Sequence, residues 1–383
     1  MTTERRIFLD NAATTPMDKE VIAAMVAVME NDYGNPSSTH AHGRVVRTLI
    51  EESRRKVAKL LNCSPGEIFF TSGGTEADNM AIRQSVESLG VKHIITSPIE
   101  HHAVLHTVEE LNKEGKVQMH LVKITPKGHV DFDHLESLLQ QYDHCLVSLM
   151  HANNEIGTLL DLDKTGELCA KYAALFHCDT VQTIGHYPFD MKKLQVHFLA
   201  CGAHKFNGPK GIGFIYINAA TKLQPFITGG SQERNMRAGT ENVYGIVGLA
   251  KALEICYRDL EKDQAQISGV RNYMKERLQE TIPGIEFNGD VDGQSSYTVL
   301  SASFPPSPIN EMMLFKLDIA GISASGGSAC SSGSNIGSHV LTALGVDPNR
   351  AAVRFSFGRQ NTREEVDFAI GKIQEMLSAR KTA

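Results

Sequence analysis

Short apolar segments alternate with amphipathic segments through the first half of the chain. Apolar and β-branched residues cluster in five segments that we expect to be strands: 68–71, 93–97, 118–122, 146–150 and 175–179. Amphipathic segments between them predict helices, one directly after Ser72 and others at 102–114, 133–141 and 161–173. This alternation predicts an α/β fold whose sheet is mainly parallel and covered on both faces by helices.

The remaining elements suggest a second unit. Helices are expected before the alternating region, at 18–30 and about 44–61, and a long helical stretch runs from Val243 to Ile282 with a soft break at Gly269. Beyond it, strands are expected near 296–304 and 352–357, and helices near 308–320, 337–344 and 362–380. A chain of 383 residues exceeds one ordinary core. We therefore place a domain boundary inside the long helix, near residue 260.

Composition excludes several classes of protein. The net charge of −6 gives no reason to expect nucleic acid or an anionic membrane as a partner, and no apolar run approaches the length of a membrane span. The first residues lack the apolar core of a secretory signal. The seven cysteines form no CxxC pair, and the sixteen histidines form no HExxH motif. We expect a cytoplasmic protein with reduced thiols and no bound metal.

Polar groups follow the predicted strands, at the sheet edge where ligands of α/β proteins gather. The segment 72–75 (SGGT) lies between a strand and a helix, so the backbone at Gly74 and the Thr75 hydroxyl offer an anion site, with Asp78 as a possible capping partner. The alternative is a helix start that uses Gly-Gly-Thr for capping alone.

Four residues indicate chemistry with a planar, nitrogen-containing ligand. Lys205 lies in a Gly-rich loop, 201–213, between two apolar strands, where loss of solvent lowers a lysine pKa and makes the amine reactive; the alternative is a solvated surface lysine. Asp179 ends an apolar strand and is suited to a cationic ring nitrogen, with Gln182 near it, or else it caps the following turn. The His101 ring can cover a planar ligand, or it is a satisfied polar residue.

Two residues of the second unit add chemistry. Cys330 lies in a Ser- and Gly-rich loop, 325–334, where a thiolate nucleophile is a better explanation than an incidental thiol. Arg354 lies within an apolar strand and suits a substrate carboxylate, unless it forms an internal salt bridge. Together with Thr240, a further candidate anion ligand, these groups fit pyridoxal phosphate.

Six ordered motifs carry a resemblance to a known family. They are 8–16 (FLDNAATTP), 34–40 (GNPSSTH), 70–79 (FTSGGTEADN), 153–157 (NNEIG), 204–211 (HKFNGPKG) and 328–332 (SACSS). With them the chain resembles cysteine desulfurases of iron–sulfur-cluster and nitrogenase type, in the class V aminotransferase group of fold-type I pyridoxal-phosphate enzymes. The resemblance implies a large domain, 15–260, with a mainly parallel seven-stranded sheet. It also implies a smaller α+β domain, formed by 1–14 and 261–383, that carries a mobile catalytic-cysteine loop.

The resemblance also implies a role for each site residue. Lys205 would bind the cofactor aldehyde, His101 would stack on the ring, Asp179 would contact the ring nitrogen and Gln182 the phenolic oxygen. The phosphate would be held by Gly74, Thr75 and His204, and by Thr240 of the neighbouring subunit of a homodimer. Asn154, beside the ring, and Arg354 would hold L-cysteine, and Cys330 would take its sulfur as a persulfide for an acceptor protein such as an iron–sulfur scaffold.

One departure and three alternatives accompany this reading. Many relatives carry a phosphate-binding serine three residues before the lysine, where this chain has Gly202. A selenocysteine lyase would share most of these residues. A class V aminotransferase would use Lys205 without needing Cys330, and a non-catalytic sulfur-transfer accessory protein would need no cofactor.

Overall fold

A seven-stranded sheet forms the centre of the molecule. The computed structural model describes residues 6–326 and 337–378. The strands are β2 (Ile68–Thr71), β3 (His93–Thr96), β4 (Gln118–Leu121), β5 (Cys145–Ser148), β6 (Leu175–Asp179), β7 (Phe198–Gly202) and β8 (Gly213–Ile217). Their order is β2-β8-β7-β6-β5-β3-β4, and only β8 runs antiparallel to its two neighbours. The predicted mainly parallel α/β sheet is confirmed.

Helices cover both faces of this sheet because successive strand residues point to opposite sides. Phe69, Ile94 and Leu146 pack with α3 (Gly74–Leu89) and α4 (His102–Lys113). Their sequence neighbours Phe70, Ile95 and Val147 pack on the other side. That side is covered by α1 (Lys19–Asn31), α2 (Ala41–Leu60), α5 (Phe132–Gln141), α6 (Leu162–Lys171) and α7 (Val243–Arg258). The doubly covered sheet buries strands on both faces, which explains their near-continuous apolar sequences.

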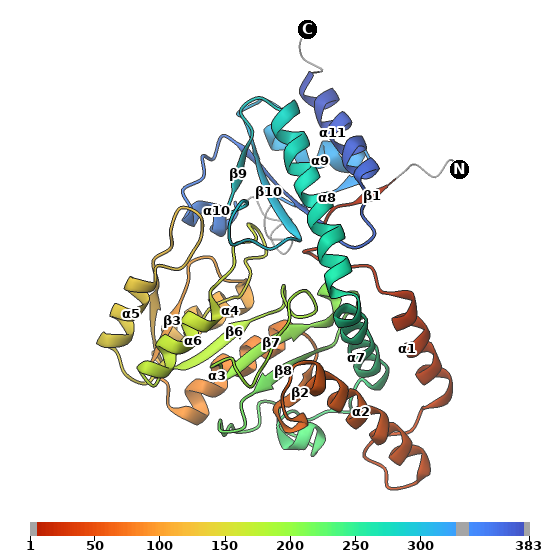
Figure 1. Cartoon of the computed structure of the whole chain (residues 1–383). Coiled ribbons are helices and arrows are strands. Elements are labelled where there is room, and N and C mark those ends of the chain that lie inside the picture. Colours follow the sequence, from red (N-terminus) through yellow and green to blue (C-terminus); the bar gives the residue numbers. More distant parts are fainter. Residues whose placement is uncertain (1–5, 327–336, 379–383) are drawn as a thin grey trace.

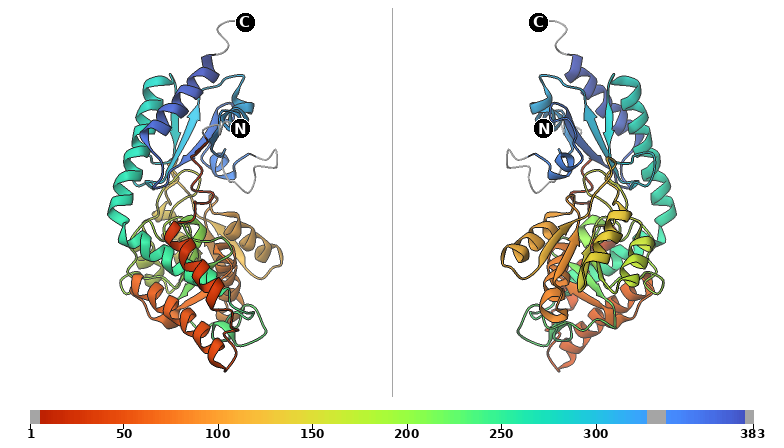
Figure 2. Two further views of the ribbon diagram at one scale, coloured as in Figure 1. Left: turned by 90° about the vertical axis from the view of Figure 1, so that its right-hand side faces the viewer. Right: turned by 90° about the vertical axis from the view of Figure 1, so that its left-hand side faces the viewer.

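A second group of elements has its own apolar core. It contains a three-stranded antiparallel sheet of β9 (Glu286–Asn288), β10 (Val299–Phe304) and β12 (Ala351–Ser356), packed against α8 (Leu260–Thr281) and α11 (Arg363–Ser378). The smaller elements are α9 (Met313–Ile319) and a parallel pair, β1 (Ile7–Phe8) with β11 (Ile322–Ser323). The short α10 (His339–Ala343) instead packs through Val340 against Ile99 and Ile156. Figures 1 and 2 show α8 running from the sheet-bearing part up along this group.

The long helical stretch breaks earlier than we expected from the sequence. Its two helices, α7 and α8, meet at Asp259, whose φ of −104° and ψ of 10° leave the helical conformation, whereas Gly269 lies inside an unbroken α8. The expected break at Gly269 is wrong because one glycine costs a helix only about 1 kcal/mol, which its packing offsets. We retain the domain division of 15–260 against 1–14 and 261–383 as a proposal, supported by the separate core that joins Ile7 and Leu9 to the C-terminal elements.

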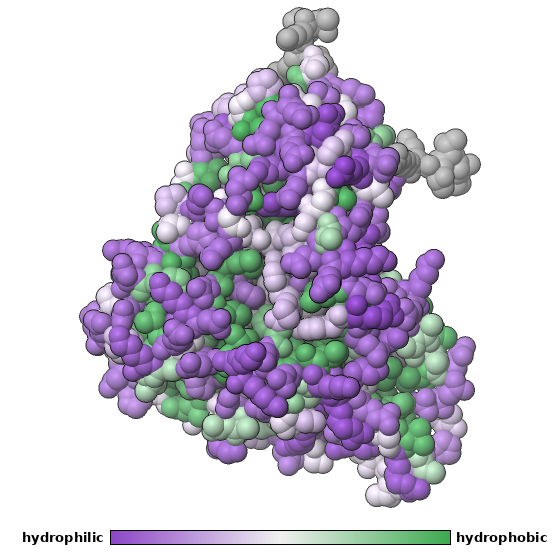
Figure 3. Space-filling model, viewed as in Figure 1, coloured by the Kyte–Doolittle hydropathy of each residue, from purple (hydrophilic) through white to green (hydrophobic). Residues whose placement is uncertain are grey.

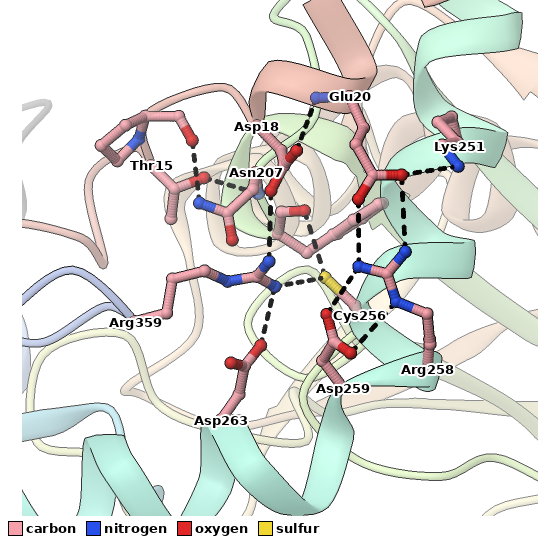
Figure 4. Close-up of polar contacts among 12 residues, drawn as sticks. Thr15, Asp18, Glu20, Asn207, Lys251, Cys256, Arg258, Asp259, Asp263 and Arg359 are labelled. Carbon is pink, nitrogen blue, oxygen red and sulfur yellow. Dashed lines mark hydrogen bonds and ion pairs between the residues drawn. The ribbon is translucent and has the colours of Figure 1, made fainter.

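Arg359 links the two groups of elements. Its guanidinium lies 3.3 Å from a carboxylate oxygen of Asp18 before α1 and 2.8 Å from one of Asp263 on α8, and it contacts Cys256 Sγ of α7 at 3.5 Å (Figure 4). The guanidinium contacts the two carboxylates through different nitrogens, Nη1 toward Asp18 and Nη2 toward Asp263. This contact fixes the base of α8 against the sheet-bearing part.

None of the helices within the described ranges combines the length and apolar character that crossing a membrane requires.

Candidate active site

A cavity of about 200 Å³ lies where the strands end and α3 begins. It is lined by Ala12, Ala13, Gly74, Thr75, Asp78, His101, Met150, Asn154, Asp179, Val181, Gln182, His204, Lys205 and Arg354. The polar groups come from the segments that follow β2, β3, β5, β6 and β7, together with β12 of the second group. The structure therefore gathers in one cavity all the site residues that we expected from the sequence, apart from Thr240 and Cys330.

Lys205 is fixed by the segment around residue 13. The lysine ends a short 3₁₀ turn, Ala203–Lys205, directly after β7. Thr15 donates its backbone N–H to the carbonyl of His204 at 2.8 Å, and its hydroxyl accepts from the backbone N–H of Asn207 at 2.7 Å (Figure 4 shows the second contact). The Lys205 Nζ donates to the carbonyls of Ala12 and Ala13. The amine is thus held at the cavity wall.

Asp179 and His101 face the same cavity from neighbouring strand ends. Asp179 is buried, and one carboxylate oxygen accepts the backbone N–H of Val181 at 2.9 Å. Burial raises the pKa of Asp179 to about 6, against the lowering influence of that N–H and of Lys205. His101 caps α4 by accepting the N–H of Ala103 at its Nδ1, and burial and the nearby Lys205 lower its pKa to about 4. A neutral imidazole therefore faces an acidic group across the cavity.

The start of α3 is suited to an anion. Unlike α1, α2 and α4, this helix has no side-chain hydrogen bond at its N-cap, so its first N–H groups are left for a ligand. A Cβ at Gly74 would lie 2.4 Å from Val181 Cγ2, so the backbone there is kept close to the cavity wall. His204 Nδ1 lies 3.3 Å from the Thr14 hydroxyl.

The capping role that we expected for Asp78 is wrong. Glu76, not Asp78, accepts the backbone N–H of Ser72 at 2.9 Å, because Glu76 occupies the first turn of the helix. The Asp78 side chain points into the interior and is 1% exposed.

Arg354 takes part in an internal salt bridge. Its Nη2 lies 2.7 Å from Asp10 Oδ1, and its Nη1 donates to the carbonyl of Asn154 at 2.9 Å. The side chain is 2% exposed, yet it lines the cavity. The salt bridge that we considered as an alternative is therefore present, and a substrate carboxylate at this guanidinium would share it with Asp10.

Two expected residues are not among the described residues that line this cavity. Thr240 is exposed and lines a different cavity, with Arg237 and Glu241, on the other side of the β2–α3 turn, so this chain alone does not bring it to the cavity that contains Lys205. Cys330 lies outside the described residues.

Several cavity residues gave no separate signal in the sequence. Met150 and Val181 line the cavity with apolar atoms and lie in none of the six motifs, whereas Ala12 and Ala13 lie in motif 8–16 but had no role assigned to them. Asp10 belonged to a recognised motif, but its contact with Arg354 joins residues 344 positions apart in the sequence. The side chains of Asp78, His101 and Asp179 also bring polar atoms within 4.8 Å of one another.

Comparison with known proteins places the chain in a family. The model of the family described as aminotransferase class-V matches residues 7–368. The chain belongs to this family. A protein named cysteine desulfurase IscS from Dictyoglomus turgidum is 41% identical, covering 99% of this chain and 96% of that protein. Another of that name, from Methanosarcina thermophila, is 42% identical, covering 98% of this chain and 93% of that protein.

Solved structures agree with this class-V assignment. A NifS-like protein superimposes with a TM-score of 0.90 at 38% identity, over 98% of this chain and all of the other. A structure described as SspA in complex with cysteine gives a TM-score of 0.81 at 27% identity, over 94% of this chain and all of the other. The class-V fold expected from the sequence is confirmed, with its mainly parallel sheet and smaller C-terminal group of elements.

Proposed function

We propose that the chain is a cysteine desulfurase that converts L-cysteine to L-alanine and transfers the sulfur to Cys330 as a persulfide. The observation that carries this proposal is the cavity that places Lys205, Asp179, His101 and the start of α3 around one space. Full-length similarity to proteins named cysteine desulfurase supports it. The cofactor would be pyridoxal 5′-phosphate, and the persulfide would pass to an acceptor protein.

The residues present fit this cofactor. The uncapped start of α3, with Gly74 and Thr75, provides backbone N–H groups for the phosphate. The buried Asp179 is a partner for a cationic ring nitrogen, since a buried carboxylate needs a compensating positive charge. Lys205 would hold the aldehyde, and Gln182 and His101 line the same cavity. When bound, the cofactor supplies an electron sink for the bonds at the substrate Cα.

The residues of the chain then bind and handle protons. The Arg354 guanidinium and Asn154 would hold the substrate carboxylate at the mouth of the cavity. The Lys205 amine would accept the Cα proton. The neutral His101, whose pKa burial lowers to about 4, is suited to relaying a proton rather than carrying a fixed charge.

Cys330 performs the sulfur transfer in this proposal. Its thiolate attacks the substrate sulfur, so a sulfur–sulfur bond forms while the bond between that sulfur and the substrate Cβ breaks. The electron pair of the broken bond stays with the substrate, whose Cβ gains a proton and becomes the methyl group of alanine. Such chemistry requires reduced thiols, and the six cysteines within the described ranges are all free. We therefore propose a cytoplasmic setting.

A homodimer is part of the proposal. Ile22, Val26 and Met29 form an exposed apolar stripe on α1, with Val45 of α2 exposed as well. Figure 3 shows apolar residues in this lower right region, and others at the left and centre of the same view. Contiguous exposed apolar residues mark interaction surfaces. We propose that a second copy of the chain covers this surface. Thr240 does not line the cavity that contains Lys205 of its own chain, and in the dimer it would contact the phosphate bound by the other subunit.

The deciding experiment supplies L-cysteine to the purified, cofactor-loaded protein. We expect alanine and a persulfide on Cys330, identified by mass spectrometry, and Cys330→Ala should abolish both. Alanine formed equally well by Cys330→Ala would contradict the proposal. Turnover of L-selenocysteine with no turnover of L-cysteine would instead identify a selenocysteine lyase.

A further inference from the structure

A second buried carboxyl group lies beside Asp179. Asp78, in the second turn of α3, brings a carboxyl oxygen within 4.8 Å of an Asp179 carboxyl oxygen and of a His101 ring nitrogen. Asp78 is 1% exposed and Asp179 is 6% exposed. Two carboxylates this close in a region sheltered from water repel one another, so the pair favours a state in which one of the two holds a proton.

The strand pattern explains why these side chains meet. His177 and Asp179 are two residues apart on β6 and therefore point to the same face of the sheet, opposite to Phe176 and Cys178. The face opposite to Phe176 and Cys178 is the one that α3 covers. The Asp78 side chain on α3 therefore extends toward His177 and Asp179 from the face of the sheet that α3 covers.

His177 provides a hydrogen-bond acceptor for a protonated Asp78. Asp78 Oδ1 lies 3.3 Å from His177 Nε2, and within the described part of the chain neither buried atom forms a hydrogen bond of regular geometry, so each is the nearest available partner for the other. His177 is fully buried, and burial lowers its pKa to about 3, so the ring is neutral. Its Nδ1 lies 2.8 Å from the Ser148 hydroxyl, on the residue paired with it across β5 and β6.

Asp179, Asp78, His177 and Ser148 follow one another in space, and only a few protonation states let each contact between neighbours be a hydrogen bond. If Asp179 is ionised, Asp78 is protonated and donates to His177 Nε2, whose Nδ1–H donates to Ser148. This arrangement directs the Asp78 proton away from Asp179 and leaves Asp179 free to pair with a cation. Burial and the nearby Asp179 raise the pKa of Asp78 well above its ordinary value, in agreement with this arrangement.

The other titratable groups around the pair do not replace this arrangement. Lys205 favours the ionised form of Asp179, and burial together with the nearby Asp179 raises the pKa of Glu100 to about 8. Glu100 is itself satisfied at one oxygen by the Ser97 hydroxyl at 2.6 Å. The thiols of Cys178 and Cys201 are buried, with pKa values raised far above the ordinary value, and stay neutral.

We propose that Asp78 and His177 are positioning residues that keep the shared proton on Asp78, so that Asp179 remains ionised for the cationic ring nitrogen of the cofactor. The proposal deepens the proposed function and rests on it for the identity of the cation. It explains why a second acid is buried next to the ring-binding acid, where one alone would suffice for the charge pair.

The first test needs no cofactor. Infrared spectra of the full-length apoprotein, labelled with ¹³C at aspartate carboxyl carbons, should show a protonated carboxyl at neutral pH. Asp78→Asn should remove that signal, and Asp179→Asn should retain it. Asp131→Asn, at the N-cap of α5, is the matched control and should also retain it, since asparagine caps a helix as well as aspartate. An unchanged spectrum in Asp78→Asn would overturn the proposal.

The second test measures cofactor affinity. Asp78→Asn imitates the protonated acid and should bind pyridoxal 5′-phosphate within about threefold of the wild type. His177→Phe should weaken binding about tenfold, because the Asp78 proton then turns toward Asp179, a change of about one pKa unit. In the Asp78→Asn background, His177→Phe should cause no further loss.

The outcomes separate the two proposals. Loss of binding in Asp78→Asn, or additive losses in the double variant, would overturn the proton-holding role while leaving the proposed function intact. Failure of the wild type to bind the cofactor would overturn the proposed function, and the infrared result would still decide where the proton lies.

Discussion

At the scale of single residues, the cavity depends on groups whose neighbours alter their chemistry. The clearest departure from the resembled family is Gly202, which leaves the phosphate end of the site without one hydroxyl. A Cβ at Gly202 would lie 3.4 Å from the Gly74 backbone nitrogen and 3.6 Å from the His204 ring, which is ordinary contact. The position therefore has room for a serine beside the α3 start.

We expect Gly202→Ser to tighten cofactor binding. The added hydroxyl would donate to the phosphate, and one such hydrogen bond is worth about 1 kcal/mol, or about fivefold in the dissociation constant. Equilibrium dialysis of the apoprotein with pyridoxal 5′-phosphate measures this. Gly202→Ala separates the hydroxyl from the methylene group, and equal affinities in the two variants would contradict the prediction.

Glu100 should make stability depend on pH. Burial raises its pKa to about 8, so the folded protein binds this proton more tightly than the unfolded chain does. The stabilisation is full below the ordinary pKa of 4.5 and is lost as the pH rises through about 8. Glu100→Gln, which still accepts the Ser97 hydroxyl, lacks this dependence.

The free energy of unfolding of the wild type, measured in urea, should therefore fall relative to Glu100→Gln between about pH 4.5 and pH 8. Each pKa unit contributes about 1.4 kcal/mol, so the relative change should reach a few kcal/mol. The protein concentration must be held constant, because an oligomer's stability depends on it. If the free energies of unfolding of the two proteins changed with pH in the same way, the pKa of Glu100 would be equal in the folded and unfolded states, and the prediction would be wrong.

At the scale of elements, one buried ion pair fastens α2 to the turn before Thr240. Arg54 on α2 forms two hydrogen bonds with Glu233, at 2.8 and 2.9 Å, and donates to the carbonyl of Ile68 on β2. Glu233 also accepts the N–H of Phe70 at 2.8 Å. Glu233 and Arg234 have positive φ angles of 43° and 55°, so these contacts hold a strained turn in place.

Removing one partner of this pair should destabilise the protein strongly. Arg54→Met leaves the buried Glu233 carboxylate without its cation, which costs about 3–5 kcal/mol in the free energy of unfolding. Lys56→Met, on the same helix, breaks an exposed pair with Glu254 and should cost less than about 1 kcal/mol. Urea unfolding compares the two, and equal losses would refute the special role of the buried pair.

The elements themselves were largely predictable because their patterns are local. Alternation of apolar strands and amphipathic helices identified the parallel sheet, and the glycine- and proline-rich segments marked the loops that bear Lys205 and Thr75. The break at Asp259 was missed because Gly269 is the stronger local signal, and packing overrides it. The contact of Arg354 with Asp10 could not be predicted from the sequence, because no local pattern indicates which distant carboxylate pairs with a buried arginine.

At the scale of the whole molecule, the exposed stripe on α1 is the surface we assign to the second copy. Val26→Glu places a charge in the middle of this stripe and should shift the dimer toward monomer in light scattering coupled to gel filtration. Leu121→Glu, at an equally exposed apolar residue on β4, is the control and should leave the mass unchanged. A Val26→Glu protein with the wild-type mass would place the interface elsewhere.

The assembly of the site was the least predictable part of the molecule, and it has a consequence for biosynthesis. Ile7 and Phe8 pair with residues 322 and 323, and the following residues reach Arg354 and the turn that bears Lys205. Contacts between segments so far apart form slowly because a long loop must close first. During translation, Asp10 is made 344 residues before its partner Arg354. The sheet can fold while the chain still grows, but the cavity cannot be complete until Arg354 has been made.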